Sequence, residues 1–147
     1  MAESYEVRRK ARICALQFLF ALEFREFEGE EDLKLFWEYL PTKKSVKKYG
    51  EFLIRGVIEH NSEIEQIIKE HLTNWDYKRV GNIEKVLMKI AIYECLFSKN
   101  VNPKVAINEA LEIAHLFATE ESPRFINGVL DKIFNSSTQE KQLPTTN

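Results

Sequence analysis

Apolar residues recur along almost the whole chain at the three- and four-residue spacing of an amphipathic helix. No segment alternates apolar and polar residues over the length of a strand. The pattern therefore predicts an all-α protein of about seven helices. In the first helix one stripe carries Val7, Ala11, Cys14, Ala15, Phe18 and Leu22. The predicted helices cover approximately residues 5–27, 30–40, 45–59, 61–72, 83–97, 103–117 and 122–134.

Turn signals divide these helices into two groups. Residues 74–77, Asn-Trp-Asp-Tyr, together with Gly81 and Asn82, form the one evident linker in the middle of the chain. Pro103 and Pro123 stand where proline is tolerated, in the first turn of a helix. We therefore expect one globular unit made of two helical subdomains packed side by side, residues 1–75 and 76–135. The polar stretch 136–147 is expected to be a disordered tail.

The composition is that of a globular protein and not of a membrane-spanning or disulfide-rich one. The chain has 147 residues, 44% of them hydrophobic and 30% charged, which is typical of soluble globular proteins. The two cysteines, Cys14 and Cys95, lie far apart in apolar helical patterns, which favours buried thiols in a reducing compartment over a disulfide. No stretch approaches the roughly 20 apolar residues of a membrane span, and no secretory leader is visible. We expect a cytoplasmic protein.

The residues that carry enzyme chemistry form no recognisable arrangement. The three histidines, His60, His71 and His115, have no metal-ligand spacing with each other or with either cysteine. The chain has no glycine-rich phosphate loop and no nucleophile signature. We therefore expect no catalytic residue, no metal and no cofactor.

Three acidic residues lie in helices where their exposure can be predicted from the apolar pattern. Glu109 and Glu112 fall on the polar side of their helix, so we expect both to be solvated. Glu94 instead falls on an apolar stripe and is expected to be buried and to need hydrogen-bond partners. For Glu94 we favour a structural carboxylate that accepts from backbone amides at a helix start over a catalytic one.

The opening of the first helix is basic. The sequence Arg8-Arg9-Lys10-Ala11-Arg12 runs directly into an apolar helical segment, whereas the chain as a whole has a net charge of -2. We expect no second positive cluster of this kind. A local basic patch held on a packed helix suggests a specific anionic partner. The alternative is that these cations only solubilise the helix end.

Two aromatic residues lie off the core stripes. Phe20, with Leu16 and Phe27, projects nearly opposite the main stripe of the first helix, on the side of Arg9 and roughly 16 Å further along the axis. Phe125 sits about 100° from the centre of the last helix's core stripe, near Arg124 and Lys132. Aromatic rings beside cations are used to bind single-stranded RNA. The alternative is that both rings fill gaps between the two subdomains.

Three segments of the chain resemble the NusB family of bacterial transcription antitermination proteins. They are RRKARICALQFLFALE near the start, NIEKVLMKIAIYE in the middle, and NPKVAINEALEIAHLFATEESPRFINGVLDKI near the end. The last is the most specific. The resemblance implies two helical subdomains. It also implies binding to the boxA element of ribosomal RNA leader transcripts as a heterodimer with ribosomal protein S10 (NusE), within the Nus complex on elongating RNA polymerase.

The resemblance also assigns roles to individual residues. The partner-facing surface for S10 would include Glu84. The RNA-facing positions would be Arg8, Arg9, Lys10, Arg12, Phe20, Lys104 and Phe125.

The chain departs from the family pattern in two places. The family often has Tyr at the position of Phe20, so that only stacking remains here. Glu120-Glu121-Ser122 stands where many members have Glu-Asp-Ser, and Ser122 can still cap a helix. Two other interpretations stay open. One is the RNA-binding extension of a ribosomal RNA cytosine methyltransferase, disfavoured because no catalytic domain follows. The other is a helical scaffold that binds only protein.

Overall fold

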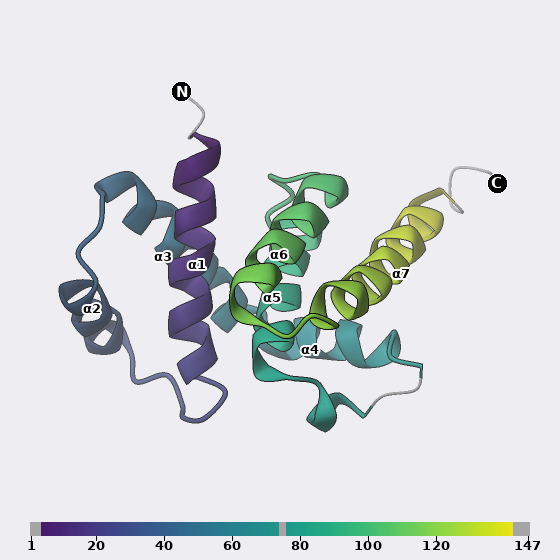
Figure 1. Ribbon diagram of the computed structural model, residues 1–147, viewed down its shortest axis with the longest axis horizontal. Helices are drawn as coiled ribbons and strands as arrows, with labels where there is room; N and C mark the ends of the chain where they lie inside the picture. Colours follow the sequence, from purple (N-terminus) through teal and green to yellow (C-terminus); the bar gives the residue numbers. More distant parts are fainter. Residues whose placement is uncertain (1–3, 74–75, 143–147) are drawn as a thin grey trace.

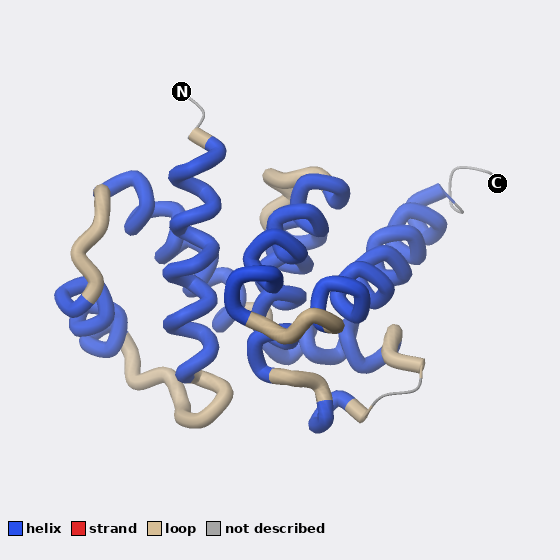
Figure 2. Tube along the Cα trace, viewed as in Figure 1, coloured by secondary structure: helices blue, strands red, loops and turns tan. Residues whose placement is uncertain are grey.

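The computed structural model describes residues 4–73 and 76–142, with side chains described through residue 136. Within those ranges every regular element is helical, which confirms the predicted all-α class (Figures 1 and 2). A short 3-10 turn, η1 (Tyr77–Arg79), precedes α5, and a π-helical turn, η2 (Tyr93–Phe97), follows it. The α-helices are α1 (Tyr5–Ala21), α2 (Glu30–Tyr39), α3 (Lys44–Glu59), α4 (Asn61–Glu70), α5 (Asn82–Ile92), α6 (Pro103–Phe117) and α7 (Ser122–Gln142).

The ends of two helices differ from those predicted. α1 stops at Ala21 rather than near Phe27, because the amides of residues 22–24 bond to carbonyls three residues back and tighten the chain into turns. α7 continues to Gln142, so residues 136–142, expected in a disordered tail, are helical. No Gly or Pro occurs between Gly128 and Pro144 to stop it. Residues 143–147 of the expected tail, and Asn74 and Trp75 of the expected linker, lie outside the described residues.

Three helices begin at the same end of the molecule. Near their starts, the guanidinium of Arg8 on α1 lies over the Tyr49 ring of α3, at 4.8 Å from its centroid. Further along, Leu19 and Val57 line one cavity, so α1 and α3 run parallel. α6 also starts beside the first turns of α1, because Tyr5 and Val105 line one cavity. α5 runs the opposite way between them (Figure 1). The N-termini of α1, α3 and α6 therefore share one end, which we call the basic end.

Close helix packing depends on small residues. Ala11 and Ala15 of α1 are fully buried. A Cβ added to Gly56 of α3 would overlap the ring of Tyr93, so glycine is what allows that ring to lie against α3. α1 packs against α3 on one side and α5 on the other, and α6 packs against α5 and α7. The core is thus continuous from α3 through α1 and α5 to α7.

A buried lysine ties the other end of α1 to the rest. Lys89 of α5 donates to Glu23 at 3.1 Å and to Glu65 of α4 at 3.0 Å. α4 contacts α5 and α7 as well as α3. The division of the chain near residue 75 stays a prediction, because α4 contacts helices on both sides of it.

None of the described helices is long and apolar enough to cross a lipid bilayer.

Candidate nucleic-acid interface

The basic opening of the chain lies on a well-defined helix. The Ser4 side chain accepts a hydrogen bond from the Val7 amide at 3.1 Å and so caps α1 at its first turn. Lys10 is exposed, and the Arg9 side chain is 36% exposed. Arg8 is half-buried against the Tyr49 ring. These three residues are the solvent-facing part of the predicted basic cluster.

Arg12 does not belong to that surface. It is only 4% exposed. Its Nε donates to both carboxylate oxygens of Glu94 at 3.1 Å, and its Nη1 donates to Glu109 Oε1 at 3.1 Å. This corrects the expectation that Arg12 is part of the RNA-facing surface, because its guanidinium is paired with the two buried carboxylates of Glu94 and Glu109. Burial lowers the pKa of Arg12, but the charge and hydrogen bond of Glu94, together with Tyr49 and Glu109, raise it by more, so the side chain stays charged.

Glu109 is a second correction. We expected it to be solvated, but it is 1% exposed. Arg9 donates to it through Nε at 3.1 Å and Nη2 at 2.6 Å, and Arg12 donates from the other side. Burial alone would raise the pKa of Glu109, but the hydrogen bond from Arg9 and the charge of Arg12 hold that pKa below its ordinary value. Glu112 is exposed, as predicted.

Glu94 is buried, as predicted, at 1% exposure. Its partners differ from those expected. It lies in the π-helical turn rather than at a helix start, and its carboxylate accepts from Arg12 and from the Tyr49 hydroxyl, not from backbone amides. Asn100 in turn donates to the Tyr49 hydroxyl at 3.0 Å. Burial and the neighbouring Glu94 both raise the pKa of Tyr49, so the phenol remains a donor.

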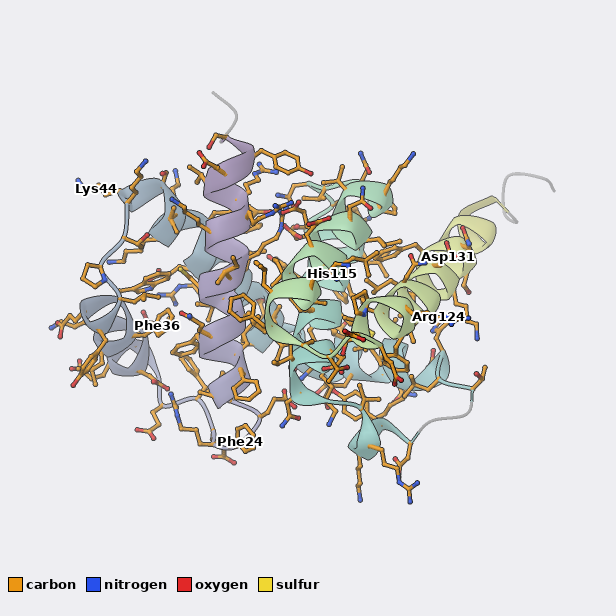
Figure 3. The ribbon with its side chains drawn as sticks, viewed as in Figure 1. Phe24, Phe36, Lys44, His115, Arg124 and Asp131 are labelled. Atoms are coloured by element: carbon orange, nitrogen blue, oxygen red, sulfur yellow. The ribbon has the colours of Figure 1, made fainter. Side chains whose placement is uncertain are left out.

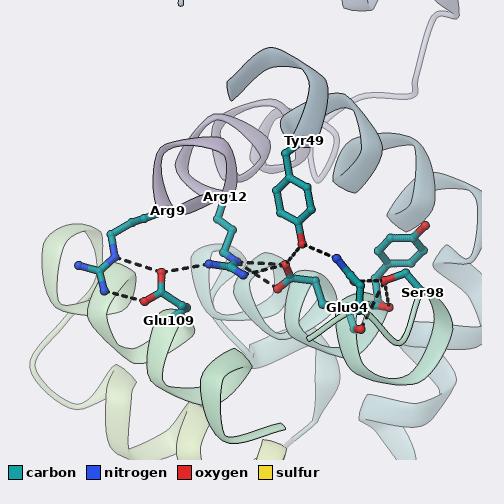
Figure 4. A network of polar contacts seen from close by, with 8 residues as sticks. Arg9, Arg12, Tyr49, Glu94, Ser98 and Glu109 are labelled. Carbon is teal, nitrogen blue, oxygen red and sulfur yellow. Dashed lines mark hydrogen bonds and ion pairs between the residues drawn. The ribbon is translucent and has the colours of Figure 1, made fainter. Parts of the chain in front are cut away.

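These contacts form one connected chain of polar side chains (Figure 4). It links α1, α3, the turn after α5, and α6, so it fixes the relative positions of the helices at the basic end. Its two guanidinium groups and two carboxylates cancel in formal charge. The positive field of the α1 opening therefore comes mainly from Arg8 and Lys10, with Arg9 partly neutralised by Glu109.

A cavity of about 270 Å³ opens beside this network. Asn102 caps α6 by accepting from the Val105 amide at 3.0 Å, and Lys104 is exposed in the first turn of that helix. Lys104 thus lies at the basic end, and its contact with RNA stays a prediction. The cavity is lined by Tyr5, Arg8, Arg12, Asn100, Val101, Asn102 and Val105.

A second basic cluster was missed in the sequence. Lys43, Lys44, Lys47 and Lys48 surround the start of α3, and all four side chains are exposed. Figure 3 shows Lys44 at the same end as the start of α1. The expectation of a single positive cluster was wrong. The spacing i, i+1, i+4, i+5 in Lys-Lys-Ser-Val-Lys-Lys was the signal that identifies it.

The two candidate stacking residues lie elsewhere. Phe20, near the end of α1, is half-buried and makes an edge contact with Phe24 at 5.4 Å between ring centroids. Phe24 is 70% exposed, lies at the end opposite Lys44 in Figure 3, and was not singled out from the sequence. Phe125 is half-buried at the start of α7. The structure therefore separates these rings from the cations of the basic end.

Glu84, the expected partner-facing residue, lies beside Phe125. Both line a cavity of about 300 Å³ between the starts of α5 and α7. The Glu84 carboxylate accepts from the Ser122 hydroxyl at 2.8 Å, and that hydroxyl also bonds Thr119 at 2.9 Å. Glu84 is thus held in place by the first residue of α7. Arg79 and Glu121 are the other charged residues that line this cavity.

The remaining candidate chemistry is sparse. Both Cys14 and Cys95 are free thiols, as predicted. Burial raises the pKa of Cys95 to about 12, which makes it a poor nucleophile. Within the described ranges, no three His, Cys, Asp or Glu side chains are grouped as a metal ion requires.

Comparison with known proteins identifies the family. Residues 9–135 match the model of the NusB family. The transcription antitermination protein NusB of Methylacidiphilum infernorum is 36% identical, with 88% of this chain and 92% of that protein covered. Among solved structures, T. maritima NusB is 34% identical with a TM-score of 0.75, covering 90% of this chain and 92% of that one. A crystal structure of the antitermination factors NusB and NusE in complex with dsRNA matches at 26% identity and a TM-score of 0.81, covering 90% of this chain and 99% of that one. The chain belongs to the NusB family.

Proposed function

We propose that this protein is an RNA-binding transcription antitermination factor and not an enzyme. In this role it binds the boxA element of ribosomal RNA leader transcripts in the cytoplasm, together with ribosomal protein S10 (NusE), and joins the other Nus factors on RNA polymerase. The relatives are named as transcription antitermination proteins, and one related structure contains NusB, NusE and dsRNA. The single structural observation that supports RNA binding most directly is the basic end, with Arg8, Arg9, Lys10 and Lys104 on two parallel helices.

The basic end suits a phosphate backbone. Its cations project from the first turns of α1 and α6, whose N-terminal dipoles add to the positive field. The polar network beneath them holds Arg9 through two hydrogen bonds to Glu109, which leaves its Nη1 for an outside acceptor. Cations placed in this way supply affinity and register, and the bases are recognised elsewhere.

The aromatic residues are the candidate base-binding elements. A base stacked on Phe20 would also lie near the exposed ring of Phe24. Stacking on such rings is worth about 1–3 kcal/mol per base. Because Phe20 and Phe125 lie apart from the cations, the RNA would have to extend along the molecule to reach both kinds of site.

The partner surface is proposed at the cavity between α5 and α7. Glu84 offers a carboxylate there that is fixed by Ser122 and suited to a basic protein. S10 bound at this place would add its own cations beside Phe125, at the end of the molecule opposite the basic end. RNA and S10 should then bind with positive coupling, and by linkage each raises the affinity of the other by the same factor.

Titration of boxA RNA into the protein, without S10 and with saturating S10, tests the proposal. We expect modest RNA affinity for the protein alone and higher affinity with S10. In the Arg8→Ala, Lys10→Ala, Lys104→Ala variant, three phosphate contacts are lost. The slope of log K against log salt should flatten by about 2, at about 0.7 per contact. Arg12 is left unchanged because it belongs to the core. Absence of any RNA binding with S10 present would favour a scaffold that binds only protein.

A further inference from the structure

The start of α3 carries more positive charge than the helix itself tolerates well. Lys43 is its N-cap, and Lys44, Lys47 and Lys48 follow within the first turns. No acidic residue lies in that first turn and no side chain caps it. Cations in the first turn of a helix oppose its macrodipole, so Lys43 and Lys44 weaken the start of α3. Within the part of the chain that the structure describes, no ion pair offsets these charges.

Another helix of the same protein shows the usual arrangement. α2 begins with Glu30, Glu31 and Asp32, which complement its dipole. The first turn of α3 thus carries the opposite charge to that of α2.

These lysines are continuous with the basic end. Tyr49, the residue after Lys48, carries the guanidinium of Arg8 on its ring at 4.8 Å. α1 and α3 run parallel, and packed helices lie about 8–10 Å apart. Along α3, Lys44 and Lys48 are separated by about 6 Å. Both separations are short enough for one nucleic-acid strand to contact cations of both helices.

We propose that Lys43, Lys44, Lys47 and Lys48, which we call the lysine ridge, bind the phosphate backbone of RNA that extends past the α1 opening. This inference rests on the proposed function and enlarges its binding surface by one helix. The ridge consists of four exposed ammonium groups at the start of one helix. Lysine ammonium groups act as mobile point charges, so the ridge adds affinity and length of contact but no preference for sequence.

An acidic protein is a less suitable occupant. Specific protein interfaces use a well-packed apolar or aromatic centre, and lysine is depleted from them. The exposed ends of the ridge provide cations, while the neighbouring buried residues Val46 and Tyr49 are committed to the core. Acidic side chains lie nearby as well, since Lys47 lines a cavity with Glu30, Glu38 and Glu51, whereas Lys43, Lys44 and Lys48 are not part of that lining.

The test uses the full-length protein without S10 and two RNAs, a boxA RNA and the same RNA extended at both ends with uridines. The test variant is Lys44→Gln, Lys47→Gln, Lys48→Gln, which leaves the N-cap residue in place. The matched control is Lys69→Glu, Lys78→Gln, which changes the net charge by the same amount at exposed positions on α4 and η1. Circular dichroism establishes that both variants fold, and removal of the lysines should leave thermal stability equal or slightly higher.

For the extended RNA we expect the salt slope of the ridge variant to flatten by about 2, three contacts at about 0.7 each, while the control keeps the wild-type slope. For the short boxA RNA, the salt slopes of the ridge variant and wild type should differ less. Restoring charge with Lys→Arg at the same positions should restore the slope. A ridge variant that matches wild type overturns this inference, and so does a control that loses as much. If the α1 and α6 cations still matter in that case, the proposed function survives. If wild type binds neither RNA, the proposed function itself fails.

Discussion

The buried network at the basic end makes a quantitative prediction about folding. Arg12 is the only cation that contacts both Glu94 and Glu109 among the described residues. Arg12→Met would leave Glu94 with the Tyr49 hydroxyl and Glu109 with the half-exposed Arg9, and neither carboxylate would keep a buried cation. Removing one partner of a buried ion pair costs about 3–5 kcal/mol, because the remaining charge is left without compensation. We expect a loss of that size.

Glu94→Gln should cost less. Its amide still offers an oxygen to Tyr49, and Arg12 keeps its bond to Glu109. The loss should be about 1–3 kcal/mol, typical of a weakened buried hydrogen bond to a charged group. In the double variant the two losses overlap. The double variant should therefore be more stable than the sum of the single losses implies, with a coupling energy of about 0.5–3 kcal/mol.

Urea unfolding followed by circular dichroism at neutral pH measures all three values. At this chain length each kcal/mol corresponds to about 2–4 °C in melting temperature. The half-exposed end of the network supplies the control, since Arg9→Gln should cost far less than Arg12→Met. Two results would refute the reasoning. One is additivity of the single variants, and the other is an Arg12→Met loss no larger than that of Glu94→Gln.

Three further predictions follow from the same structure. Folding lowers the pKa of Glu109, so its contribution to stability is complete above about pH 4.5 and is lost as the pH falls through the lower pKa of the folded state. The free energy of unfolding of Glu109→Gln should therefore fall less steeply with decreasing pH than that of wild type. Gly56→Ala should lower the free energy of unfolding by about 1–3 kcal/mol, because the new methyl overlaps Tyr93, and a stability equal to wild type in a urea titration would contradict this. Glu84→Lys should weaken S10 binding in calorimetry and lower RNA affinity only when S10 is present, whereas Ser122→Ala, which keeps the charge, should have a smaller effect.

Helix positions were predicted well where local chemistry determines them. Asn102 and Pro103 mark the start of α6, and the acidic run after Gly29 marks the start of α2, because capping and dipole effects operate within one turn. Helix ends were less predictable. The turn after Ala21 is stabilised by Arg25, which bonds Asp32 at 2.7 Å across the loop, and nothing in the spacing of apolar residues reveals that contact.

The candidate site was predicted only in part, for a related reason. A helical projection identifies which side of one helix is polar but not whether another helix covers it. Arg12 and Glu109 each lie on the polar side of an amphipathic pattern, and they meet because α1 and α6 start at the same end. The lysine ridge is plain in the sequence as a run of charges. Its relation to Arg8 depends on the parallel packing of α1 and α3, which the sequence pattern does not contain.

The network also explains how a helix can be both core and binding surface. A cationic opening would repel itself if all its charges were exposed, and would be costly if all were buried. Here Arg12 is neutralised inside by two carboxylates, Arg9 is shared between Glu109 and solvent, and Lys10 faces solvent. Charge compensation thus falls off from the core to the surface along a single helix. Mutations at the inner end should act through folding, and mutations at the outer end should act through the salt dependence of binding.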